Sequence, residues 1–296
     1  ILTNAQMITP DTAAAALGVA AFYCFRRWLA SPDWNRALLT GLALGVAELT
    51  KMTWIVLFVL WPVIWVLWRW TGAEGPRLAS IWRQFGQLAL MGVVAIYILN
   101  LGYGFAETCR PIGEFTFLSR PLSGRDNARL RLIVPDNRFR ESWSSKFPVP
   151  VPAAYLQGLD QQKDEFEDGY HSYLRGEWRH GGWWYYYLYA LLIKIPLGTW
   201  VLVTVALAVT VFARRYAAAW REELLLVAPI AVVIALVSSQ TGFNHHMRYV
   251  LPVFPFLLIW ISKVARAFEF GHRKLAVVVV GALVWSAGSS LYHYPH

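Results

Sequence analysis

Charged residues, cysteines and the common ligand-binding motifs are all scarce in this sequence. Only 15% of the 296 residues are charged, against roughly 25% in ordinary soluble domains. We find no phosphate-binding Gly-rich loop and no GxGxxG, CxxC or HExxH pattern, which argues against Rossmann-type nucleotide binding. The acidic stretch at residues 160–168 lacks the regular spacing of a calcium loop. We therefore name no metal ligand and no certain cofactor.

Hydrophobic residues are abundant instead, at 57% of the chain, and 16 residues are tryptophan. They form long apolar runs, and flanking Trp, Tyr and Arg can extend each run towards the roughly 20 residues that a membrane span needs. The runs predict an all-α multi-pass membrane protein with about eight transmembrane helices, which we expect at Thr12–Phe25, Ala37–Leu49, Trp54–Trp68, Phe85–Leu101, Trp183–Ala213, Leu224–Val237, Tyr249–Ile261 and Leu275–Leu291.

The formal net charge of +9 follows from this topology. Basic residues gather in alternate short loops, and under the positive-inside rule those loops face the cytoplasm. The only basic residues in the short loops on the other side are Lys51 and Arg248. We therefore expect the bilayer and no nucleic acid as partner, in a bacterial inner (plasma) membrane with the large loop outside. Cys24 and Cys109 then lie on opposite sides of a core of roughly 30 Å and cannot form a disulfide.

The one long extramembrane stretch covers residues 102–182 and has equal numbers of acidic and basic residues. We expect membrane helices at 1–101, an outer (periplasmic) loop at 102–182 with an interfacial segment to about residue 196, and further membrane helices at 197–296. The run Trp183–Ala213 is too long for one straight span. We expect a surface helix, a break at Ile195-Pro196, and a span from about Leu197.

Three charged residues stand at the predicted outer ends of spans. Asp11 is either a helix-start residue favoured by the macrodipole or a carboxylate directed at a polar substrate. Lys51 either extends to the lipid headgroups or binds a phosphate. Glu48 precedes Lys51 by three residues, a helical pair spacing. Arg248 stands at the start of a late span, where a charge needs a partner or a wet cavity.

Four further residues are candidates on chemical grounds. His245 and His246 either face interfacial water or bind phosphate and assist proton transfer. Trp183 belongs to an aromatic belt, whose rings either anchor the chain at the interface or stack on sugars. Trp183 and Tyr249 are the candidate substrate-binding aromatics.

Four elements appear in order along the chain: ITPDTA, AELTKMT, a long loop ending in an aromatic-Lys-Pro run, and HMRYVLPVFPFL. Together they resemble the lipid-linked-sugar glycosyltransferases of GT-C architecture, specifically the branches similar to protein mannosyltransferases and aminoarabinose transferases (glycosyltransferase families 39 and 83). The resemblance implies transfer of a hexosyl or pentosyl group from a polyprenyl-phosphate donor to an acceptor on the outer face, with inversion.

The resemblance also carries over residue roles. Asp11 matches the acid of the family's Thr-x-Asp element, Lys51 the lysine of its Leu-Thr-Lys element, and Arg248 the arginine of its Arg-Tyr-x-x-Pro element. Lys51 and Arg248 are the implied donor phosphate ligands, and His245 and His246 are further phosphate-binding candidates on the chemical grounds given above. Asp11 is the catalytic candidate, as a support for the base. Met52 stands where a glycine is common. The family's principal base lies in an earlier loop, so we expect an internal fragment whose base is upstream of Ile1.

Two other functions are open on the sequence. A transporter or lipid flippase also places charges at membrane mouths and uses proline-broken helices. A membrane scaffold would use the loop to bind partners. The sequence does not identify the sugar, the acceptor or the lipid length.

Overall fold

The structure is a computed structural model that describes residues 10–71, 78–125, 134–213, 215–242, 244 and 247–292. Helices are the main regular structure of these residues, and their one sheet is an antiparallel hairpin, β1 (His171–Leu174) and β2 (Glu177–His180). The long helices are α2 (Pro10–Ala30), α3 (Trp34–Thr50), α4 (Leu57–Trp70), α5 (Leu78–Gly102), α8 (Ala153–Asp168), α10 (Leu197–Phe212), α11 (Trp220–Ser239) and α14 (Arg273–Tyr292). The shorter helices are η1 (Met52–Val56), η2 (Ile112–Glu114), α6 (Arg120–Ser123), α9 (Tyr186–Lys194), η3 (Met247–Val253), α12 (Phe254–Ile261), η4 (Ser262–Ala265) and α13 (Arg266–Glu269).

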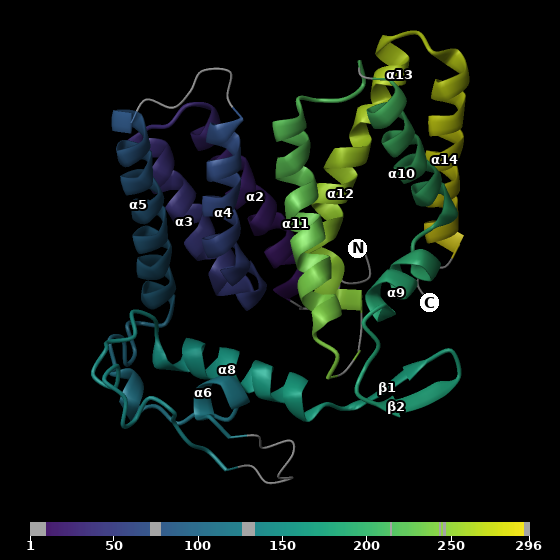
Figure 1. The fold of residues 1–296 in the computed structure, drawn as a ribbon. Coiled ribbons are helices and arrows are strands. Elements are labelled where there is room, and N and C mark those ends of the chain that lie inside the picture. Colours follow the sequence, from purple (N-terminus) through teal and green to yellow (C-terminus); the bar gives the residue numbers. More distant parts are fainter. Residues whose placement is uncertain are drawn as a thin grey trace.

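The apolar helices stand side by side in three groups (Figure 1). One group holds α2 to α5, α11 and α12 lie in the middle, and α10, α13 and α14 form the other side. The described residues of 103–125 and 134–185, which we call the loop segment, lie beyond one end of the helices and contain α6, α8 and the hairpin. We call that end the loop end and the opposite one the far end.

Helices occur at all the predicted span positions, which confirms an all-α multi-pass membrane protein. Among the described residues, five helical stretches are long and apolar enough to cross a membrane, and the bent pair α9–α10 makes a sixth. The predicted number of about eight is larger because α2 and α3 do not pass that test. The helix α3 has only 17 residues, and α2 carries Asp11 in its first turn and Arg27 in its last.

The break predicted at Ile195-Pro196 is present. The helix α9 ends at Lys194, Ile195 and Pro196 are both extended, and α10 begins at Leu197. The two helices meet at 109°. Proline disfavours helical geometry in the residue before it, so the break is encoded locally.

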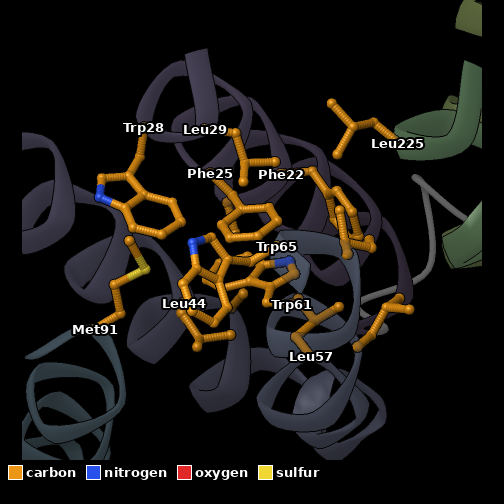
Figure 2. Close-up of a cluster of buried hydrophobic side chains, with 14 of the residues drawn as sticks. Phe22, Phe25, Trp28, Leu29, Leu44, Leu57, Trp61, Trp65, Met91 and Leu225 are labelled. Atoms are coloured by element: carbon orange, nitrogen blue, oxygen red, sulfur yellow. The ribbon is translucent and has the colours of Figure 1, made fainter. Parts of the chain in front are cut away.

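Aromatic side chains fill the core of the first group (Figure 2). Phe25 stacks on Trp61 with ring centroids 4.5 Å apart and planes 3° from parallel. Gly41 and Gly45 let α3 approach α5 closely, because a Cβ on Gly45 would lie 2.9 Å from the carbonyl oxygen of Ala95. Small residues four apart are the usual means of close helix packing in membranes. This packing sets the direction of α3 and therefore the position of its last turn.

The loop segment is tied to the membrane helices and to itself by buried polar contacts. Asn100, at the end of α5, donates to the carbonyl oxygen of Pro150 at 2.8 Å. Asp160 on α8 is buried and accepts from the backbone N–H groups of Leu118 and Ser119 at 2.6 and 3.0 Å. The helix α8 therefore lies across the loop end in a defined position (Figure 1).

Candidate functional site

Asp11 and Lys51 form an ion pair at the loop end. Asp11 stands in the first turn of α2, and Lys51 is an extended residue (φ −163°, ψ 128°) between α3 and η1. The Lys51 Nζ lies 2.6 Å from Asp11 Oδ1, and the two side chains are 15% and 4% exposed. A charge-assisted contact this short and this sheltered from water holds the ammonium in one place.

Arg248 and Tyr249 reach the same place from η3. The Lys51 Nζ lies 3.4 Å from the backbone oxygen of Arg248 and 5.4 Å from the centre of the Tyr249 ring. The Arg248 guanidinium lies 5.4 Å from the same ring. Two cations therefore share one aromatic ring, a favourable but modest contact. We call Asp11, Lys51, Arg248 and Tyr249 the loop-end site.

The two cations differ in how their charge is compensated. Lys51 is neutralised by Asp11. Arg248 is exposed, and no acidic residue in the described ranges forms an ion pair with it. The site therefore offers an anion one open guanidinium and one ammonium that it would share with Asp11.

The turn that carries Lys51 is held on its α2 side by Trp54. The Trp54 indole N–H donates to the carbonyl oxygen of Ala14 at 2.9 Å, and the side chain is fully buried. Its ring occupies the space beside Gly18, where a Cβ would lie 1.9 Å from Trp54 Cζ2. Gly18 is thus a site where only a hydrogen side chain permits the observed packing.

Glu48 does not pair with Lys51, which corrects the reading of their helical spacing. The helix α3 ends at Thr50 and Lys51 is extended, so the two side chains do not lie on one helix face. Glu48 is buried and accepts from the Tyr155 hydroxyl on α8 at 2.8 Å. Burial and then the charge of Glu48 raise the pKa of Tyr155 well above its usual range, so this hydroxyl stays a donor.

Trp183 lies outside this cluster. Trp183 is buried, its ring faces the Arg179 guanidinium at 5.1 Å, and its backbone N–H donates to the side-chain oxygen of Asn244. The Asn244 N–H donates to Ser172 Oγ at 2.7 Å. Asn244 thereby helps to join the chain that follows α11 to the hairpin. His245 and His246 lie outside the described residues.

The acidic stretch at the end of α8 is engaged in structure. Asp160 is committed to the loop contacts described above, and Lys163 lies 3.4 Å from Glu167. No group of three or more His, Cys, Asp or Glu residues within the described ranges is arranged to hold a metal ion.

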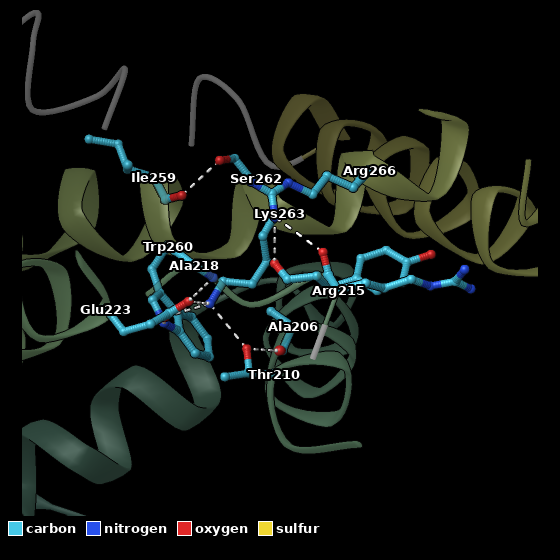
Figure 3. A network of polar contacts seen from close by, with 11 residues as sticks. Ala206, Thr210, Arg215, Ala218, Glu223, Ile259, Trp260, Ser262, Lys263 and Arg266 are labelled. Carbon is cyan, nitrogen blue, oxygen red and sulfur yellow. Dashed lines mark hydrogen bonds and ion pairs between the residues drawn. The ribbon is translucent and has the colours of Figure 1, made fainter. Parts of the chain in front are cut away.

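A second polar cluster lies at the far end (Figure 3). Lys263 forms an ion pair with Glu223 at 2.5 Å and donates to Thr210 Oγ1 at 3.0 Å. Trp260 donates to the same carboxylate at 2.6 Å. A cavity of 460 Å³ opens beside it between α2, α11 and α12. The cluster joins α10, α11 and η4, so its evident role is to fix these helices.

Taken together, the helices and the sheltered charges at their ends define a multi-pass helical membrane protein with a polar site at one membrane face. The model of one family, the dolichyl-phosphate-mannose-protein mannosyltransferases, matches residues 1–103. This match confirms the resemblance to GT-C glycosyltransferases and supports a membrane glycosyltransferase of that type. No curated protein and no solved structure matches the chain.

The matched residues cover α2 to α5 and include Asp11 and Lys51. Arg248 and Tyr249 lie beyond the match. Their place in the site rests on the contacts with Lys51.

Proposed function

We propose that the protein transfers a sugar, with inversion, from a polyprenyl-phosphate donor to an acceptor at the outer face of a bacterial inner membrane. The name of the matching family describes a dolichyl-phosphate-linked sugar donor, which is a lipid phosphate of this class. The observation that carries the proposal is the meeting of Asp11, Lys51 and Arg248 at the loop end. The stretch predicted as the outer loop, residues 102–182 with an interfacial part to about 196, then faces outwards.

In this proposal Lys51 and Arg248 bind the donor phosphate. When the bond between sugar and phosphate breaks, negative charge builds on the leaving phosphate. Cations held beside it stabilise that charge more in the transition state than in the ground state. Arg248 supplies an exposed fork of N–H donors, and Lys51 supplies a compact charge held in place by its neighbours.

Asp11 has a positioning role in this scheme. Its carboxylate is buried and bonded to Lys51, so it faces the ammonium. Tyr249 presents its ring to both cations and supports them beside the phosphate. Trp183 is too buried for open stacking, so we assign it to the packing that holds the η3 side of the site. The proposal assigns neither the base that activates the acceptor nor a role for His245 or His246.

The test is sugar release from a purified protein in nanodiscs given a polyprenyl-phosphate sugar. We expect Lys51→Ala and Arg248→Ala each to lower kcat/KM by at least ten-fold, the scale of one charged contact. Arg140→Ala, which removes an exposed arginine of the loop segment, is the matched control. Unchanged sugar release in both site variants contradicts the proposal. Movement of intact lipid without sugar release supports a flippase instead.

A further inference from the structure

The helix α8 contacts the chain both before and after Lys51. Glu48, three residues before Lys51, accepts from the Tyr155 hydroxyl at 2.8 Å. Met52, the residue after Lys51, packs on Gly158, where a Cβ would lie 2.7 Å from Met52 Cε. Tyr155 and Gly158 are three residues apart on α8, so they share one face of that helix. One face of the loop segment thus contacts the chain on both sides of the lysine.

The helix α8 is itself held in place by hydrogen bonds. Asp160 anchors α8 to residues 118 and 119 through two backbone N–H groups and the Ser119 hydroxyl. Asn100 ties the preceding chain to the end of α5 through Pro150. The helix α8 therefore has its own supports, independent of its contacts with Glu48 and Met52.

The hydrogen bond between Tyr155 and Glu48 also contributes to stability. Glu48 is 2% exposed, and among the described residues its second oxygen, Oε1, has no hydrogen-bond partner. The Tyr155 hydroxyl is therefore the donor that compensates the burial of this carboxyl group. Loss of that donor leaves a buried polar group unsatisfied, which costs more than the hydrogen bond itself. Without this hydrogen bond the last turn of α3 is also no longer held against α8, and Lys51 follows directly after that turn.

We propose that Tyr155 and Gly158 of α8 are positioning residues for the donor phosphate site, acting through Lys51. The inference rests on the proposed function and adds a role for the loop segment. In this arrangement α2 places Asp11 and α8 places the backbone of Lys51. The Lys51 ammonium is then in position to bind the phosphate only while α8 of the loop segment is docked.

Binding of a polyprenyl monophosphate to the protein in nanodiscs tests this role, with the matching polyprenol as the phosphate-free control. We expect Tyr155→Phe to weaken binding of the phosphate by about five-fold, the scale of one hydrogen bond. Glu48→Gln keeps an acceptor for Tyr155 and should bind within about two-fold of the unaltered protein. Tyr173→Phe, which alters an exposed tyrosine of the hairpin, is the matched control.

The double variant Glu48→Leu/Tyr155→Phe separates positioning from stability. Replacing both partners by apolar groups leaves no buried polar atom unsatisfied, so the melting temperature should stay close to that of the unaltered protein. Binding of the phosphate should still fall by about five-fold, because the hydrogen bond that holds the last turn of α3 against α8 is lost. In a Lys51→Ala background, Tyr155→Phe should have no further effect, since the two changes act through one residue.

Methionine methyl groups give an independent spectroscopic readout, because the chain has 4 methionines. With ¹³C-methyl labelling, Tyr155→Phe and Gly158→Ala should shift the Met52 signal and leave that of buried Met91 in place. If Tyr155→Phe fails to fold, Gly158→Ala tests the positioning role in its place.

The outcomes separate the two proposals. If Lys51→Ala weakens binding but Tyr155→Phe and Gly158→Ala bind like the unaltered protein, the positioning role is wrong and the proposed function stands. If Lys51→Ala itself binds the phosphate normally, both fail.

Discussion

The carboxylate of Asp11 lies 2.6 Å from the ammonium of Lys51, although 40 residues separate them in the chain. The pair joins the first turn of α2 to the turn after α3. It therefore turns two helix ends into one site, with the backbone oxygen of Arg248 as a third contact.

Breaking this pair on one side should destabilise the protein. Lys51→Met leaves Asp11 buried without its cation, and an uncompensated buried charge costs about 3 kcal/mol. The double variant Asp11→Leu/Lys51→Met removes both charges and should recover most of that loss. Thermal unfolding in detergent measures the difference. A double variant less stable than the single one would show that the pair is not the main interaction of these residues.

Arg248 should affect ligand binding and leave folding unchanged. The side chain is exposed and makes no ion pair with a described acidic residue, so Arg248→Ala removes little packing. We expect an unchanged melting temperature and a fall of at least ten-fold in kcat/KM for the lipid-linked donor. The weakening should shrink at high salt, because salt screens an exposed charge. An equal loss at low and high salt would argue for a steric effect instead.

Gly18 is the sharpest packing test in α2. Gly18→Ala places a Cβ 1.9 Å from Trp54 Cζ2, so the indole must move and its bond to Ala14 is strained. Overpacking of this kind costs about 1–3 kcal/mol, and the turn with Lys51 should loosen with it. Gly281→Ala in α14 is the matched control, because nothing lies within 4 Å of its Cβ. That change should be neutral or stabilising, by up to about 1 kcal/mol. Melting temperatures of the two variants should therefore move in different directions.

The membrane orientation can be tested with the native cysteines. Cys109 is an exposed free thiol of the loop segment, and Cys24 lies in the far half of α2. With the predicted orientation, a membrane-impermeant maleimide added to intact cells should label the protein through Cys109 alone. Labelling should vanish in Cys109→Ser and should stay absent when Trp220→Cys, at the far end, is added to that variant. Labelling of Trp220→Cys in intact cells would reverse the topology.

Much of this architecture could be predicted because the bilayer imposes simple rules on a sequence. Long apolar runs and alternating basic loops predicted where helices run and at which end Asp11, Lys51 and Arg248 stand. The α9–α10 break was predictable because Pro196 acts on its own neighbour. The span number was harder to predict: α2 and α3 are short or charged, and they are held by packing against α4 and α5.

The partners within the site were not predictable in the same way. Helical spacing suggested that Glu48 pairs with Lys51, but the end of α3 at Thr50 separates their directions. Tyr155 has no sequence signal at all, since a tyrosine in a polar helix is unremarkable until α8 lies across the loop end. Asn244 likewise gains its role only when the hairpin lies against the chain that follows α11.

The sequence alone was enough to predict a membrane protein, the helix positions and the helix ends at which Asp11, Lys51 and Arg248 stand, because hydrophobicity and charge act on each segment separately. The tertiary structure alone decided which of those charges meet. Asp11 pairs with Lys51, and Glu48 pairs with Tyr155. That choice depends on how closely α3 packs on α5, where Trp54 fits beside Gly18, and how the loop segment supports α8. These are long-range packing contacts, and no local pattern in the chain encodes them.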